Sequence, residues 1–310
     1  MNIGSRPLVP SRIAGGAHGT KRAPRTVVGG YISLTKPRII ELLLVTTVPT
    51  MVLAEGGWPS TWLVIATVIG GTFAAGGANA INMVIDRDID PLMERTKNRP
   101  LVTGIVKPRG AMIFAISLEI LAFGFLWITS NLLAAILAVS ATMFYVLIYS
   151  LWLKRTSRQN IVIGGAAGAA PVLVGWAAVT NGLGWSPWVL FALIFLWTPP
   201  HFWALAIKHV DEYRAANVPM LPVVATMSET LRSMVIYTVA LVSCSVVLIP
   251  VANLGWVYGA TAAVAGALFL AGTLKLAKEP TESGAMRLFS FSISYITLLF
   301  TAIAVDTLVK

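Results

Sequence analysis

The chain has 310 residues, of which 56% are hydrophobic and only 12% are charged, and its mean hydropathy is +0.78. A soluble domain carries about 25% charged residues, so the composition excludes a soluble protein and indicates a polytopic membrane protein. The net charge of +10 does not indicate a nucleic-acid partner. The basic residues lie in short loops between apolar segments, which is typical of membrane topology and contact with anionic lipid.

Residues 1–30 are rich in Gly, Pro, Ser, Ala and Arg and contain no long apolar stretch. A signal peptide needs an apolar core, so we expect a disordered basic N-terminal tail here. The remaining residues, 31–310, are predicted to form a single transmembrane domain.

Hydropathy predicts an all-α fold, a bundle of about nine membrane-spanning helices of roughly 20 residues each. The predicted spans are 38–55, 61–87, 110–129, 132–153, 160–179, 187–208, 231–251, 254–274 and 287–306. Small residues recur in the second and fifth spans, where they are expected to let helices approach closely.

The charges alternate between the two sides of this bundle. Every Lys and Arg except Lys310 lies before the first span or in the connections on one side. The positive-inside rule therefore predicts a cytoplasmic N-terminus and, with nine spans, a C-terminus outside.

The end of the second span carries the first candidate site. Asn82, Asp86 and Asp90 are spaced four residues apart, so on a continuous helix they share one face. Pro91 predicts that the helix stops at Asp90. Asn and carboxylate oxygens are hard ligands that suit Mg²⁺ holding a substrate phosphate. Arg95 and Arg99 follow in the sequence and could donate hydrogen bonds to the phosphate oxygens. The alternative is a solvated loop with mixed charges.

The end of the sixth span carries a second candidate. Pro199 and Pro200 are predicted to interrupt the helix, and His201 follows directly. Two alternatives stay open for His201, a contact with an acceptor molecule or a hydrogen bond to a carbonyl freed by the prolines. Further polar residues continue to the cytoplasmic end of the span: Lys208, Asp211 and Glu212.

Other polar positions near the spans are open to two interpretations. Glu41 and Glu119 lie inside the first and third spans, where ionisable groups usually face a cavity or a partner; for Glu119 we favour a structural hydrogen bond. Tyr149 and Lys154 end the fourth span, either as interfacial residues or as ligands of a phosphate.

These stretches resemble the UbiA superfamily of intramembrane prenyltransferases. The resemblance rests on N-x-x-x-D-x-x-x-D at 82–90, N-R-P-L-V-T-G at 98–104, P-P-H-F-W-A-L-A-I at 199–207 and D-E-Y-R-A-A-N-V-P-M-L-P-V at 211–223. The last two blocks are similar to the haem-modifying branch. Many members carry a second D-x-x-x-D, but here Ala215 stands four residues after Asp211, which leaves open which acid of this segment approaches a metal.

The resemblance implies a helical bundle around a central cavity in a bacterial-type inner membrane, with the active site facing the cytoplasm. It implies that farnesyl diphosphate binds through Mg²⁺ and that its farnesyl group passes to a vinyl group of haem B with addition of water, giving haem O. Farnesyl diphosphate, haem B and the lipid bilayer are the expected partners, without nucleic acid. A downstream haem-modifying enzyme or a terminal oxidase assembly is a further candidate.

Pattern and resemblance together predict three groups of site residues. The catalytic group is Asn82, Asp86, Asp90, Arg95, Arg99, Lys208 and Asp211, and the metal-binding group is Asn82, Asp86, Asp90, Asp211 and Glu212. The substrate- or cofactor-binding group is Lys36, Arg38, Glu41, Tyr149, Lys154, His201 and Tyr213.

Three rival hypotheses remain at this point. A prenyltransferase for a quinone precursor or another aromatic acceptor would share the diphosphate site and differ around His201. A transporter would explain intramembrane charges and broken helices, although no internal repeat is visible. An assembly factor with a degenerate site is disfavoured by the intact set of Asn82, Asp86 and Asp90.

Overall fold

The computed structural model describes residues 26–310, apart from the side chains of residues 38–44. Most of the predicted tail, residues 1–25, lies outside the described residues, and so do the side chains of Arg38 and Glu41. Helix α1 (Val27–Leu34) begins after Thr26, whose hydroxyl accepts a hydrogen bond of 3.1 Å from the Gly29 amide. The chain is therefore already helical before residue 30, where the predicted tail ends.

Helices make up all the regular secondary structure between residues 26 and 310. The longer ones are α2 (Pro37–Glu55), α3 (Thr61–Ile85), α4 (Pro108–Thr129), α5 (Leu132–Met143), α7 (Asn160–Thr180), α8 (Trp185–Lys208), α11 (Met227–Val251), α12 (Trp256–Lys278) and α13 (Glu282–Leu308). The shorter ones are the 3₁₀ turns η1 (Asp86–Asp88) and η2 (Asp90–Leu92), the π-helix η3 (Phe144–Leu153), α6 (Lys154–Thr156), α9 (Val210–Ala215) and α10 (Leu221–Val224).

The nine-span bundle is confirmed in outline. Within the described residues, eight helical segments are long and apolar enough to cross a membrane, and α2, whose side chains are described only in part, runs beside α7 and α13. The protein is an integral membrane protein. With α5, η3 and α6 counted as one crossing (Leu132–Thr156), the eight segments and α2 coincide with the predicted spans to within about five residues at each end, close to the usual scatter of helix boundaries from sequence.

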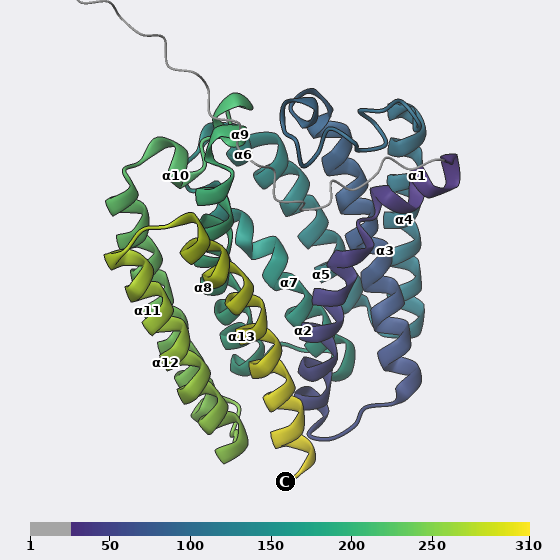
Figure 1. Ribbon diagram of the computed structural model, residues 1–310. Helices are drawn as coiled ribbons and strands as arrows, with labels where there is room; N and C mark the ends of the chain where they lie inside the picture. Colours follow the sequence, from purple (N-terminus) through teal and green to yellow (C-terminus); the bar gives the residue numbers. More distant parts are fainter. Residues whose placement is uncertain (1–25) are drawn as a thin grey trace, which may run out of the picture.

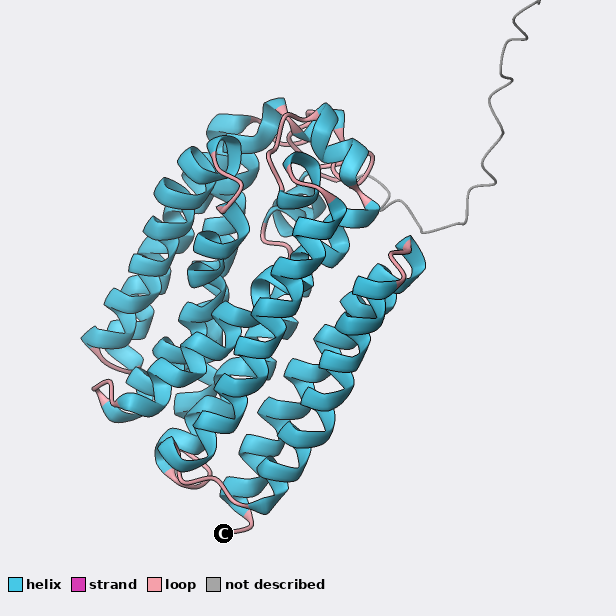
Figure 2. Ribbon diagram, turned by 90° about the vertical axis from the view of Figure 1, so that its left-hand side faces the viewer, coloured by secondary structure: helices cyan, strands magenta, loops and turns pink. Residues whose placement is uncertain are grey.

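The long helices lie side by side (Figures 1 and 2), and the short helices gather at one end of the bundle. The short elements α6, α9 and α10 lie at the upper end in Figure 1, and the C-terminus lies at the lower end. Neighbouring helices pack in sequence from α3 through α5, and α13 closes the bundle by contacting both α2 and α8.

Helices α7 and α8 are the most enclosed part of this bundle. In their most apolar stretches 56% and 61% of residues are buried, compared with 22% in α4 and in the segment from α5 to α6. A helix that faces lipid leaves one side uncovered by protein. Helices α7 and α8 therefore form the inner layer of the bundle, where protein separates polar groups from lipid.

Small residues bring α3 and α4 together, as predicted. A Cβ placed on Gly70 would lie 2.5 Å from Leu126, and one on Gly77 would lie 3.0 Å from the Ala115 carbonyl oxygen. The Thr142 hydroxyl donates to Glu119 at 3.2 Å, so Glu119 makes the structural hydrogen bond that we favoured.

Two local predictions are wrong. Helix α8 runs unbroken through Pro199 and Pro200. Helices α7, α11 and α13 pack against it, and prolines are tolerated in membrane helices where neighbouring helices compensate for the freed backbone groups. Helix α3 ends at Ile85 rather than Asp90. Two 3₁₀ turns follow it, so the three motif residues do not lie on one continuous helix.

Candidate active site

Asn82, Asp86 and Asp90 nevertheless gather at the end of α3. Their exposed fractions are 3%, 0% and 1%. The Asn82 amide donates to Asp86 Oδ2 at 2.9 Å and to the Ser150 hydroxyl at 3.1 Å. Asp88 lies on the other side with a side chain that is 58% exposed. Of the three acids in this stretch, Asp86 and Asp90 are therefore buried and Asp88 is exposed.

Three cations surround the two buried carboxylates. Lys154 pairs with Asp86 Oδ2, and Arg99 Nη1 lies 2.7 Å from both carboxylate oxygens of Asp90. Lys36 donates to Asn82 Oδ1 at 3.4 Å. With all five groups ionised, the cluster carries one more positive than negative charge, which favours binding of an anion.

Burial shifts the pKa values of two cluster residues that lie outside the membrane-spanning segments, Asp90 and Lys36. Desolvation raises the pKa of Asp90, although the adjacent Arg99 guanidinium opposes the shift. Desolvation also lowers the pKa of Lys36, and the charges of Arg99 and Lys154 lower it further. A bound anion would offset the mutual repulsion of these cations, which is a reason for the cluster to hold one.

The π-helix η3 presents a polar face toward the cluster. It contains Ser150, the partner of Asn82, and Tyr145 and Tyr149, whose rings stack with centroids 5.4 Å apart. π-helical segments are rare and frequently occur at functional sites. The segment continues into α6, which delivers Lys154 to Asp86.

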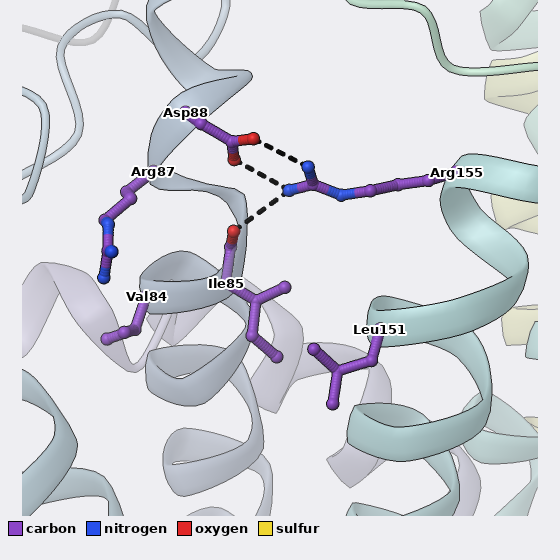
Figure 3. A pocket seen from close by; sticks show the side chains of 6 residues that line it. All are labelled: Val84, Ile85, Arg87, Asp88, Leu151 and Arg155. Carbon is purple, nitrogen blue, oxygen red and sulfur yellow. Dashed lines mark hydrogen bonds and ion pairs between the residues drawn. The ribbon is translucent and has the colours of Figure 1, made fainter.

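Arg155 bonds to residues at the end of α3 and in the first 3₁₀ turn, beside the cluster (Figure 3). It donates to both carboxylate oxygens of Asp88 at 2.6 and 2.7 Å and to the Ile85 carbonyl at 3.0 Å. Its guanidinium also lies 4.0 Å from Asp86 Oδ1. These bonds fix the first 3₁₀ turn to α6, and a groove of about 530 Å³ lies beside them between Arg87 and Leu151.

The second acidic segment, Asp211 to Tyr213, has one acid in solvent and one that is partly buried. Asp211 is 89% exposed and pairs with Arg214, so the structure does not bring it to the cluster. Glu212 Oε1 accepts a hydrogen bond of 2.8 Å from His209 Nδ1, and its other oxygen is buried without a hydrogen-bond partner in the described part of the chain.

The two acidic segments meet through Tyr213. Its hydroxyl accepts a hydrogen bond of 3.4 Å from Arg95, and its buried ring packs in a cluster with Ile89 and Met93. Lys208 lies elsewhere, 4.0 Å from Glu282 of α13. Tyr213 is thus the predicted residue that joins this segment to the one at the end of α3.

His201 lies apart from the ionic cluster, in an aromatic environment. Its ring stacks between Trp197 and Phe289 at centroid distances of 4.2 and 4.5 Å. Its Nδ1 lies 2.6 Å from the Ser292 hydroxyl, which donates to the Phe289 carbonyl at 2.6 Å. The ring therefore bonds to a hydroxyl on α13 and not to a carbonyl freed by the prolines.

The cluster fits a divalent cation shared with a phosphate better than one held by protein alone. Among the described residues, no group of three carboxylate, imidazole or thiolate side chains could hold a metal. Asp86 Oδ1, however, is buried and has no hydrogen-bond partner in that part of the chain. Mg²⁺ commonly takes one or two carboxylates and completes its shell with water and substrate phosphate oxygens.

Sequence reasoning missed Ser150 and Arg155 as members of the site. Serine gave no signal, because only its contact with Asn82, 68 positions away, gives it a role. In the sequence, Arg155 is only one of the basic residues that predict membrane orientation. The available signal for a role in the site is its position next to Lys154, a predicted site residue.

The site is thus a buried cluster of cations and carboxylates at one end of an apolar, membrane-spanning helical bundle. The sequence matches the UbiA prenyltransferase family over residues 43–298. The chain belongs to this family, and it is a prenyltransferase.

Relatives of similar length carry a more specific name. The chain is 48% identical to the protoheme IX farnesyltransferase of Clavibacter michiganensis, over 99% of each chain. It is 53% identical to the protoheme IX farnesyltransferase of Leifsonia xyli, over 91% of this chain and 92% of that one.

Solved structures share the fold. Digeranylgeranylglyceryl phosphate synthase superposes with a TM-score of 0.77 at 20% identity, covering 92% of this chain and 99% of that one. A UbiA homologue from Archaeoglobus fulgidus bound to GPP and Mg²⁺ superposes with a TM-score of 0.60 at 17% identity, covering 88% and 99%. At these identities the likeness concerns the fold alone.

Proposed function

We propose that the protein transfers the farnesyl group of farnesyl diphosphate to a vinyl group of haem B, with addition of water, and releases haem O and diphosphate. The observation that carries this proposal is the buried cluster in which Lys36, Arg99 and Lys154 outnumber Asp86 and Asp90. The names of the relatives at about 50% identity support the choice of prenyl group and acceptor.

The cluster would stabilise the leaving diphosphate. When the bond between farnesyl C1 and oxygen breaks, its electron pair stays on the diphosphate, and positively charged donors already in place lower the energy of that charge. Lys154 and Arg99 are positioned by their carboxylate partners, so they need little reorganisation when the bond breaks. The apolar bundle keeps bulk water away from the allylic cation.

Mg²⁺ would be held by oxygens of Asn82, Asp86 and Asp90 together with the diphosphate, and when bound it would neutralise part of the diphosphate charge. Glu212 is the acid of the second segment that could support this site, because Asp211 is exposed. Tyr213 and Arg95 would hold the two segments together.

The acceptor end is proposed to lie toward His201 and its aromatic neighbours. The vinyl double bond supplies the electron pair that forms the new carbon–carbon bond, and water adds to the cation left beside the porphyrin and loses a proton. Because the Ser292 hydroxyl donates to a carbonyl, the His201 ring donates through Nδ1 and keeps the lone pair on Nε2. That nitrogen could bind haem iron or accept a hydrogen bond from a protonated propionate.

We further propose that the site end faces the cytoplasm of a bacterial-type cell, because the Lys and Arg residues gather in the connections at that end. The lipophilic product would remain in the bilayer, from which a downstream haem-modifying enzyme or terminal oxidase assembly could take it.

The direct test is mass analysis of haems after incubation of the detergent-purified protein with haem B, farnesyl diphosphate and Mg²⁺. We expect a product heavier than haem B by one farnesyl and one hydroxyl group, and chelation of Mg²⁺ should abolish it. A parallel reaction with an aromatic acid of the quinone-precursor type should give no product. Prenylation of the aromatic acid instead of haem would refute the acceptor assignment.

A further inference from the structure

Asn160 is a buried amide without a partner. Its exposed fraction is 0%, and within the described residues neither its Nδ2 nor its Oδ1 makes a hydrogen bond. An amide side chain offers two donors and an acceptor with two lone pairs, and leaving such groups buried and unpaired destabilises a fold. A polar side chain kept at such a cost needs an explanation other than packing.

The position of Asn160 relates it to the anion-binding cluster. It is the first residue of α7, and α6, which carries Lys154 to Asp86, comes just before it in the chain. The N-terminus of a 21-residue helix favours negative charge. The preceding residue, Gln159, makes no side-chain bond to the first turn.

The face of α7 that carries Asn160 is directed toward the site. Residues four apart share a helix face, and a Cβ on Gly164 would lie 2.9 Å from Tyr149 Cε2. Ile161, the next residue, belongs to the buried apolar cluster that contains Ile89 and Tyr213. The first turn of α7, which begins with Asn160, therefore packs against η3 and against apolar residues of both acidic segments.

We infer that Asn160 is a substrate-binding residue, whose amide N–H groups donate to an oxyanion of a substrate at the start of α7. This inference rests on the proposed function, which supplies two sources of such an oxyanion, the diphosphate of the prenyl donor and a propionate of the haem acceptor. The proximity of Lys154 along the chain favours the diphosphate.

The substitution Asn160→Leu tests the inference, because leucine has nearly the same size and no polar atom. If the amide is unpaired until substrate binds, the substrate-free variant should unfold at the same temperature as the wild type or higher. Its affinity for substrate should fall at least tenfold, which corresponds to the loss of one hydrogen bond to a charged group.

Asn131→Leu is the matched control. Asn131 is also a helix-terminal asparagine, but its Oδ1 accepts from the Ala134 amide at 2.9 Å and its Nδ2 donates to the Ala177 carbonyl at 2.7 Å. Because its hydrogen bonds are all within the protein, Asn131→Leu should lower the unfolding temperature and leave substrate affinity unchanged. The two variants should thus show opposite patterns.

The measurements use the full-length protein in detergent, with Mg²⁺ and inorganic diphosphate, with Mg²⁺ and farnesyl diphosphate, and separately with haem B. Weaker binding of both diphosphates by Asn160→Leu assigns the oxyanion to the donor, and weaker binding of haem B alone assigns it to the acceptor. If the wild type binds all three and the variant binds them equally well, the inference is wrong. It is equally wrong if Asn160→Leu fails to fold or unfolds at a lower temperature, because Asn160 would then have a structural role. A wild type that binds neither farnesyl diphosphate nor haem B would instead overturn the proposed function, and the inference with it.

Discussion

Asp86 contacts more basic side chains than Asp90, the other buried carboxylate of the motif. It is fully buried, accepts from Asn82, pairs with Lys154 and lies 4.0 Å from Arg155. One of its oxygens still has no hydrogen-bond partner in the described part of the chain. A carboxylate held this firmly, with one oxygen that accepts no hydrogen bond there, is suited to bind a cation that arrives with the substrate.

Asp86→Asn removes the negative charge and keeps the shape of the side chain. We expect turnover at saturating farnesyl diphosphate to fall by at least ~10²-fold, the effect of losing one electrostatic stabiliser of a transition state. Asp88→Asn is the control, since that side chain is exposed and lies on the other side of the turn, and its effect should be much smaller. Near-normal turnover of Asp86→Asn, in protein shown to be folded, would contradict the metal assignment.

At this scale the four-residue spacing predicted that Asn82 and Asp86 lie together, but not all their partners. The partners Ser150 and Lys154 come from 68 residues away along the chain, a separation that no local pattern encodes. Asp211 shows the converse error, because the acidic sequence around it does not reveal which of two adjacent acids faces the interior.

Helix α7 and the π-helix η3 together shape the polar end of the bundle. The close approach of Gly164 to the ring of Tyr149 lets the two elements pack without a side chain between them. Hydropathy correctly predicted both spans. It could not predict the π-helical geometry, because mean hydropathy does not report whether a turn closes its hydrogen bonds from i to i+4 or from i to i+5.

Gly164→Ala should therefore displace Tyr149. A Cβ at this position would lie 2.9 Å from Cε2 and 3.0 Å from Cγ of the ring, so the tyrosine must move. A shift of this kind near a reacting group can cost up to about a hundredfold in rate, and we expect a tenfold or larger loss of turnover.

Gly168→Ala provides the comparison on the same helix, since nothing lies within 4 Å of a Cβ there. Both changes raise helix propensity equally, so a difference in turnover between them reports the Tyr149 contact and not the helix. Equal turnover in the two variants would mean that the position of Tyr149 is unimportant for the reaction.

The whole molecule separates its charges between two ends. The connections at the site end carry the cations of the cluster and most of the remaining Lys and Arg residues. At the opposite end, Asp306 accepts hydrogen bonds from the amides of Gly255, Val257 and Tyr258 and lies 3.3 Å from Lys310. The single cation predicted outside is thus neutralised by a buried acid, so it adds little to the charge that sets orientation.

This asymmetry could be predicted from the sequence, because hydropathy and loop charge are local properties. The same local properties misjudged α8. Two consecutive prolines predicted a break, but the helix stays continuous where α7, α11 and α13 pack against it. Context supplied by neighbouring helices outweighed the local preference.

The orientation of the bundle can be measured by labelling single cysteines from one side of the membrane, in a Cys244→Ser background. Lys97→Cys and Lys278→Cys, both exposed at the site end, should react only with reagents that reach the cytoplasm. Glu55→Cys, at the end of α2 that lies away from the site, and a reporter fused after Lys310 should be accessible from outside. The charge difference between the two ends is the physical reason, because cationic loops are retained on the cytoplasmic side. If Lys97 and Lys310 were found on the same side, the odd number of crossings would be wrong. If all four sites were inverted, the diphosphate cluster would face away from the compartment that we propose supplies its substrate.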